Sequence, residues 1–161
     1  IDGLAITEVI KTILLIEFFS ASSSVLTPLS ILVVLSLLPL YYFNFKKSQK
    51  VFLGDGGSLL LGTIVAIYIF YVLGNQYQFK ENFQINKVLF VVLVIVYPLV
   101  DLLRVFILRI KDGKSPFEAD QRHIHHFLNN KFNSHFKVIL TVLIIEILIT
   151  AFCVFINQIG F

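Results

Sequence analysis

The chain has 161 residues, of which 57% are hydrophobic and only 14% are charged, with a net charge of +3. Its mean hydropathy is +0.88, whereas a soluble domain carries about 25% charged residues. This composition excludes an ordinary soluble domain, and the expected fold class is an all-α polytopic membrane protein. The single cysteine, Cys153, excludes a disulfide bond within the chain.

Hydrophobic segments separated by polar or glycine-containing clusters predict five membrane helices within one domain, residues 1–161. The clearest segment runs from Gly56 to Phe79 and holds no charged residue over 24 positions, and about 20 apolar residues span a bilayer. The first predicted helix is interrupted by Glu8, Lys11 and Glu17. In chain order, the predicted helices cover about 5–20, 26–44, 58–74, 87–109 and 137–157.

Lysine and arginine are concentrated in two parts of the chain. Residues 45–57 and 104–137 together hold ten of the 13 basic residues. Because basic residues favour the cytoplasmic side of a membrane, loops 45–57 and 110–136 are predicted to be cytoplasmic. The N-terminus is then cytoplasmic and the C-terminus lies outside. Three distant segments would share one face, and so could build one site.

The segment Phe52–Ser58 places Asp55 among glycines at the start of the third predicted helix. Backbone amides and the positive end of a helix favour an anion there. A carboxylate beside them can hold magnesium, which bridges to phosphate oxygens. The alternative is purely structural: Asp55 and Ser58 cap the helix, and the glycines let the chain turn.

A second group of charged residues lies in the fourth predicted helix. Asp101 is three residues before Arg104, so the two can pair on one helical face. An ionisable residue inside an apolar helix is costly and therefore indicates function by default. The alternative is a structural ion pair, with Arg109 reaching toward the lipid headgroups.

The longest polar run, Lys111–His126, contains three histidines within four positions: His123, His125 and His126. Zinc is disfavoured because no cysteine lies nearby and the spacing matches no common zinc pattern. With Arg122, the histidines can donate hydrogen bonds to phosphoryl oxygens, and a histidine can act as an acid or base near neutral pH. The alternative is a solvated interfacial loop. His135 and Glu146 are assigned no role.

These motifs occur in one order along the chain: Phe52–Ser58, then Pro98–Asp101 with Arg104 and Arg109, then Gly113–Phe117 with Asp120 and His123–His126. This set resembles the polyprenyl-phosphate N-acetylhexosamine-1-phosphate transferase superfamily, glycosyltransferase family 4. The His-Ile-His-His form is similar to the undecaprenyl-phosphate GlcNAc-1-phosphate transferase branch, and less so to the muramoyl-pentapeptide branch. The segment Ile1–Ala5 resembles the end of the family's Asp-Gly-x-Asp-Gly-Leu segment.

The resemblance covers nearly the whole chain and implies the C-terminal half of an enzyme with about ten membrane helices. The implied reaction transfers N-acetylhexosamine-1-phosphate, with GlcNAc-1-phosphate preferred, from a UDP-sugar to undecaprenyl phosphate and releases UMP. It implies Mg²⁺, with Mn²⁺ as an alternative, a bacterial inner membrane with cytoplasmic active-site loops, and no nucleic acid partner. Homodimerisation is left open. The product would enter a cell-envelope glycan pathway, such as teichoic acid or lipopolysaccharide synthesis.

The resemblance also implies residue roles. Asp55 would be the magnesium ligand, and Asp2 and Phe52 would line the nucleotide site, with Phe52 stacking on uracil. Phosphate contacts would come from Arg122, Lys114, His123, His125 and His126, the three histidines being counted with Asp55 as catalytic. Asp101 and Arg104 would support the site. The family's paired aspartates are absent, so this chain by itself is expected to be inactive.

Two other classes of function fit parts of this sequence. A transporter or permease fragment would also contain buried charges such as Asp101 and Glu146. It predicts polar residues spread along several helices at the membrane midplane, whereas here the charges collect at one face. A non-catalytic membrane scaffold would leave Asp55 and the histidine run without a purpose.

Overall fold

The computed structural model describes residues 3–21, 24–46, 48–81, 83, 85–118 and 122–159. Within these ranges the fold is all-α, with no strand and one isolated bridge between Ser20 and Phe79. The predicted fold class is confirmed. The helices are α1 (Leu4–Phe19), α2 (Thr27–Phe45), α3 (Gly54–Leu73), α4 (Lys87–Val94), α5 (Val96–Lys111), α6 (Ile124–Phe132) and α7 (His135–Ile159).

Three described helices, α2, α3 and α7, are long and apolar enough to cross a membrane, and α4 with α5 forms a fourth candidate if the bent pair is one span. The predicted count of five is therefore not confirmed. The predicted helix 5–20 is present as α1, but its 16 residues extend only about 24 Å at 1.5 Å per residue. The hydrocarbon core of a bilayer is about 30 Å thick.

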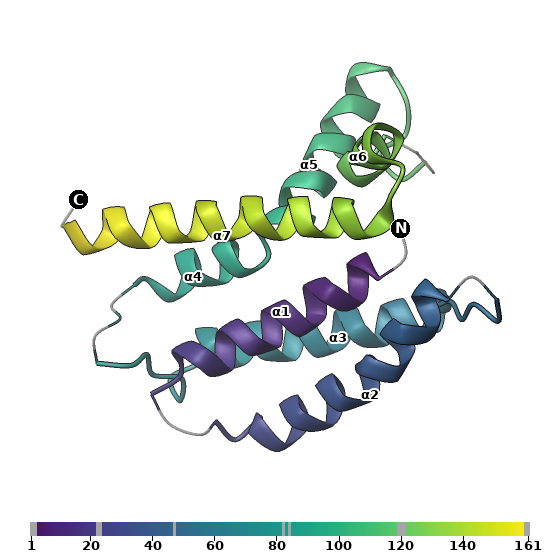
Figure 1. Ribbon diagram of the computed structural model, residues 1–161. Helices are drawn as coiled ribbons and strands as arrows, with labels where there is room; N and C mark the ends of the chain where they lie inside the picture. Colours follow the sequence, from purple (N-terminus) through teal and green to yellow (C-terminus); the bar gives the residue numbers. More distant parts are fainter. Residues whose placement is uncertain are drawn as a thin grey trace.

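The predicted single helix 87–109 is wrong, because it is broken at Ile95 and its two parts, α4 and α5, differ in direction by 74°. Pro98 favours a break at this point, although a proline alone does not end a helix, since α2 continues through Pro39. Proline has no N–H to donate, and its ring collides with the carbonyl four residues earlier. That carbonyl belongs to Val94, the last residue of α4. In Figure 1, α5 consequently leaves the direction of the other long helices.

One apolar core joins α1, α2, α3 and α4, and its centre includes the fully buried Ile13, Tyr68 and Phe90. A smaller core joins Leu4 of α1 to α7 through Val138, Ile139 and Val142. Many large apolar side chains are instead exposed, among them Leu59 and Phe70. Such exposure is expected where a helix faces lipid, because lipid tails are as apolar as the side chains.

At the end of the bundle opposite the candidate site, polar side chains connect the end of α1 to neighbouring segments through hydrogen bonds. Glu17 near the end of α1 accepts hydrogen bonds from the hydroxyls of Ser24, Thr27 and Ser30, at 3.0, 3.0 and 2.5 Å. The buried Tyr77 hydroxyl donates to the Ile16 carbonyl oxygen at 2.9 Å. This oxygen belongs to the last turn of α1, whose carbonyls have no partner within the helix.

We expect Tyr77→Phe to lower stability by about 1 kcal/mol, because a buried carbonyl then loses its donor. Thermal unfolding in detergent measures the change. Tyr42→Phe is the matched control, since Tyr42 is 64% exposed. Equal unfolding temperatures for Tyr77→Phe and wild type would contradict the capping role.

Candidate functional site

A buried carboxylate holds the histidine segment against α5. Asp101 is 5% exposed, and its Oδ2 lies 3.0 Å from Nδ1 of His123. Its Oδ1 accepts the backbone N–H of Ile124, the first residue of α6, at 2.7 Å. The first N–H groups of a helix lack internal partners, so Asp101 caps α6 from another helix. A negative charge is also favoured at that position.

Arginine side chains form hydrogen bonds that hold the rest of the loop against α5. Arg104 donates to the backbone carbonyl of Arg122, and Arg109 donates to that of Pro116. Arg122 in turn donates to the Asp112 carboxylate. The predicted supporting residues, Asp101 and Arg104, thus both bond the segment that carries the histidines. Their role in the site remains a prediction.

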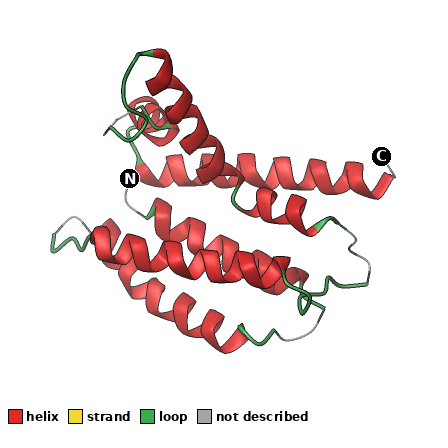
Figure 2. Cartoon of the chain, turned by 180° about the vertical axis from the view of Figure 1, so that it is seen from behind, coloured by secondary structure: helices red, strands yellow, loops and turns green. Residues whose placement is uncertain are grey.

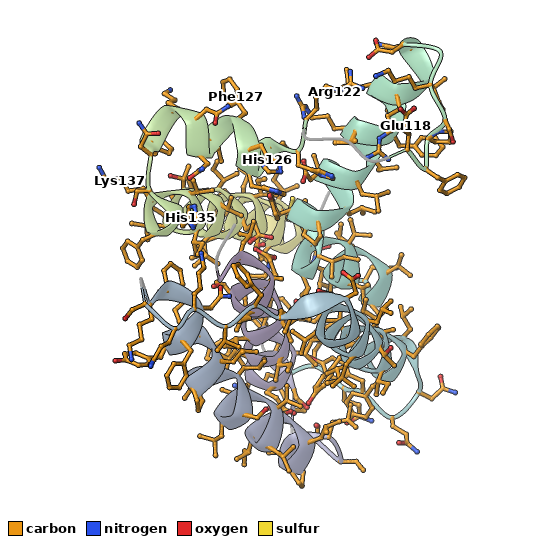
Figure 3. The ribbon with its side chains drawn as sticks, turned by 90° about the vertical axis from the view of Figure 1, so that its right-hand side faces the viewer. Glu118, Arg122, His126, Phe127, His135 and Lys137 are labelled. Atoms are coloured by element: carbon orange, nitrogen blue, oxygen red, sulfur yellow. The ribbon has the colours of Figure 1, made fainter. Side chains whose placement is uncertain are left out.

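The three histidine rings gather at the start of α6. The rings of His123 and His125 stack with centroids 5.3 Å apart, and those of His125 and His126 lie 4.5 Å apart. The Tyr97 hydroxyl lies 3.2 Å from Nδ1 of His125. In Figure 3, His126 lies on the side of α6 toward α5, whereas Phe127 points away from the bundle.

Burial is the main cause that lowers the pKa of His125 from 6.5 to about 4; the neighbouring His126 adds to this shift and the Asp101 carboxylate opposes it. The imidazole is therefore neutral at pH 7. A neutral ring with Nδ1 accepting from Tyr97 carries its proton on Nε2. His125 can then offer an N–H donor to a phosphoryl oxygen without binding an extra proton.

We expect the pKa of His125 to make the fold acid-sensitive. The unfolded chain takes up this proton near pH 6.5 and the folded chain only near pH 4, so stability is lost as pH falls through that window. In His125→Gln, the fall in unfolding temperature between pH 7 and pH 5 should be smaller. His135→Gln is the control and should keep the wild-type dependence. An equal fall in His125→Gln and wild type would contradict a lowered pKa.

Removing the cap on α6 should loosen the histidine segment. In Asp101→Ala, amide hydrogen exchange over residues 122–132 should speed up by about tenfold, because the α6 N–H loses its acceptor. Exchange measured by mass spectrometry tests this, with the exposed Glu118→Ala as control. Unchanged exchange in Asp101→Ala would show that other contacts hold the segment.

Asp55 lies in the first turn of α3, so the predicted start at residue 58 is wrong by about one turn. No side chain caps this helix start; the Ser58 hydroxyl instead donates to the Gly54 carbonyl at 2.9 Å. The structural alternative therefore holds only in part: Asp55 and Ser58 do not cap the helix through hydrogen bonds, whereas a glycine does let the chain turn. Gly54 has φ +67°, a conformation that favours glycine. Asp55 is exposed.

Phe52 and Lys114 are also exposed. The Phe52 ring is 69% exposed, with Nζ of Lys50 5.1 Å from its centroid. Lys114 lies beyond the end of α5, and its backbone N–H donates to the Arg109 carbonyl at 3.0 Å. Asp2 and Asp120 lie outside the described residues.

Two features of the site were missed from the sequence. Buried Asn44 accepts the Gly3 N–H and donates to the Val51 carbonyl at 2.8 Å, so it links the start of α1 to the segment before Asp55. Helix α6 was predicted as loop. Its apolar residues, Ile124, Phe127, Leu128 and Phe132, follow helical spacing, and Asn133 ends the helix in the left-handed conformation. This spacing was an available signal.

The starts of α1, α3 and α7 lie at one end of the bundle together with α6 (Figures 1 and 2). Asp55 and the histidine segment are therefore at the same end. In the described part of the chain no hydrogen bond or ion pair joins Asp55 to the histidine segment, and no group of three histidine, cysteine or acidic residues there could hold a metal ion by itself. A bound ligand would have to bridge the two parts.

Comparison with known proteins shows which family this chain is similar to. Residues 1–74 match the profile described as Glycosyl transferase family 4. The predicted resemblance is confirmed over this part of the chain, which is similar to the family 4 glycosyl transferases. No solved structure matches the chain.

Three curated relatives illustrate the similarity. Decaprenyl-phosphate N-acetylglucosaminephosphotransferase from Mycobacterium leprae is 34% identical over 119 residues, which are 71% of this chain and 30% of the relative. The undecaprenyl-phosphate alpha-N-acetylglucosaminyl 1-phosphate transferase of Pasteurella multocida is 33% identical over 62% of this chain and 27% of its own length. The Escherichia coli K12 enzyme of the same name is 29% identical over 59% and 25%. The matches thus span under a third of these relatives.

Proposed function

We propose that the protein transfers N-acetylhexosamine-1-phosphate, preferentially GlcNAc-1-phosphate, from a UDP-sugar to undecaprenyl phosphate. The observation that carries the proposal is the presence of Asp55 and the histidine segment at one end of a membrane bundle. The relatives' names supply a polyprenyl phosphate acceptor and an N-acetylglucosamine phosphate group. The same end is cytoplasmic in the predicted topology, where nucleotide sugars are made.

In the proposed reaction, an oxygen of the acceptor phosphate forms a bond to the β-phosphorus of the UDP-sugar. The bond from that phosphorus to the bridging oxygen breaks, and UMP leaves with the oxygen and its electron pair. Negative charge shifts toward the leaving phosphate. Donors and positive charges held in place around the diphosphate therefore lower the barrier.

The histidine segment suits the phosphate groups. Neutral His125 offers an N–H, and Arg122 offers a charge-assisted donor, the stronger kind of hydrogen bond. His123 and His126 stand beside them on a segment whose position is fixed by Asp101. These side chains would bind the diphosphate or the lipid phosphate. Lys114, on the same loop, would add positive charge.

Asp55 suits a magnesium ion. Magnesium is commonly held by one or two carboxylates together with substrate phosphates and water, so an exposed carboxylate at a helix start fits that use. When bound, the ion would neutralise charge on the diphosphate. Phe52, exposed just before α3, would stack on the uracil ring, and Asp2 would line the nucleotide site.

An apolar groove supports a lipid acceptor. It lies between α1, α2 and α7, has a volume of about 1260 Å³, and is lined mostly by apolar side chains such as Leu14, Leu38 and Leu143. An isoprenoid chain would enter this groove from the bilayer, and packing contacts would hold it there, because lipid tails are as apolar as the lining. The product would be a lipid-linked sugar for a cell-envelope glycan, made in the bacterial inner membrane.

The test measures UMP release from UDP-GlcNAc with undecaprenyl phosphate and Mg²⁺, using protein expressed from its complete gene. We expect Asp55→Asn and His126→Ala each to lower kcat by about 100-fold or more. Glu81→Gln, in the loop before α4, should leave turnover unchanged. Wild-type turnover in Asp55→Asn would remove Asp55 from the metal role, and no UMP release from the wild type would refute the proposed reaction.

A further inference from the structure

Three ionisable side chains meet inside the bundle, away from the candidate site. Nζ of Lys11 lies 2.6 Å from Oε2 of Glu8 and 2.5 Å from Oε1 of Glu146, so the cluster joins α1 to α7. The side chains are 13%, 13% and 5% exposed for Lys11, Glu8 and Glu146. With all three ionised, the cluster would carry one uncompensated negative charge in an apolar interior. Such a charge is expensive there.

One oxygen of each carboxyl group in the cluster lacks a hydrogen-bond partner. Oε1 of Glu8 and Oε2 of Glu146 are both buried and accept no hydrogen bond. One oxygen of each carboxyl group contacts the same Nζ of Lys11, so the two carboxyl groups lie side by side. Two ionised carboxylates in contact repel each other and leave both oxygens unsatisfied, whereas one shared proton satisfies both and makes the cluster neutral.

The surroundings decide which carboxyl group holds the proton. Oε1 of Glu146 also faces the backbone N–H of Tyr97 at 3.4 Å, which belongs to the first turn of α5. A negative charge is stabilised at a helix N-terminus. The donor partner of the Glu8 carboxyl group is the Lys11 ammonium, without a helix N-terminus beside it. Tyr97 is the further titratable group that α5 brings to the cluster.

We propose that Glu8 is protonated at neutral pH and donates to an ionised Glu146, and that this pair, with Lys11, fixes the bend between α4 and α5. Glu146 is then a positioning residue. It accepts a hydrogen bond from the backbone N–H of Tyr97, which the break between α4 and α5 leaves without a partner inside a helix. The bend matters to the candidate site because α5 carries Asp101 and because the Tyr97 hydroxyl contacts His125. Lys11 and Glu146 also line the apolar groove between α1, α2 and α7.

Infrared spectroscopy of the protein, expressed from its complete gene and reconstituted in lipid nanodiscs, tests the proton directly. At pH 7 we expect a carbonyl stretch of a protonated carboxyl group that shifts in D₂O. The band should be lost in Glu8→Gln and kept in Glu81→Gln, a matched change at an exposed glutamate. Absence of the band in the wild type, or its full retention in Glu8→Gln, would overturn the proposal.

Thermal unfolding gives a second readout. Gln keeps the size and donor capacity of a protonated Glu, so Glu8→Gln should unfold within about 2 °C of the wild type. Lys11→Met should unfold several degrees lower because it strands the Glu146 anion, the usual result of removing one partner of a buried pair. An equal loss in Glu8→Gln and Lys11→Met would show that Glu8 is ionised and overturn the proposal.

Discussion

The break that Pro98 imposes between α4 and α5 is the constraint on which the candidate site depends. The proline ring disfavours a continuous helix through Val94, and α5 turns by 74° relative to α4. This direction carries Asp101 and Arg104 to the loop that follows α5, where they bond the histidine segment. A straight helix would have kept both side chains along the membrane axis. The geometry of the site therefore begins with a steric effect of one residue.

Breaking a helix inside a membrane protein exposes backbone groups that lipid cannot satisfy. The structure meets this cost with side chains from other helices. Glu146 of α7 faces the Tyr97 N–H, and Asp101 receives the first N–H of α6. At the opposite end, Tyr77 donates to a carbonyl in the last turn of α1. Buried polar residues in this protein thus work largely as helix caps that reach across the bundle.

The candidate site has two parts that differ in character. The histidine part is held by many hydrogen bonds and is half-buried. The part around Asp55 is exposed and lies on a segment that Asn44 ties to the start of α1. Such a division suits a two-substrate reaction, in which preorganised donors receive phosphate groups while an open carboxylate takes up a hydrated cation with its substrate.

Much of the fold followed from composition and local pattern. The apolar segments predicted α2, α3 and α7 closely, because a stretch of about 20 apolar residues has few stable forms other than a membrane helix. The motif set also predicted the resemblance to family 4, which the profile match over residues 1–74 confirms for that part of the chain. The predicted helix bounds were wrong where a single residue changes the backbone within a long hydrophobic segment. Hydropathy alone favours a single helix over 87–109, whereas Pro98 stops it.

The sequence by itself determined the elements, their apolar faces and the types of residue available for phosphate chemistry. Only the tertiary structure decided what each buried charge binds. Asp101 could pair with Arg104 on its own helix, but the turn of α5 brings it to Ile124 and His123. The sequence marked Glu146 only as a buried charge, and its partners come from α1 and α5, more than a hundred and nearly fifty residues earlier in the chain. Hydrogen bonds between distant segments depend on helix directions, and local sequence does not specify those directions.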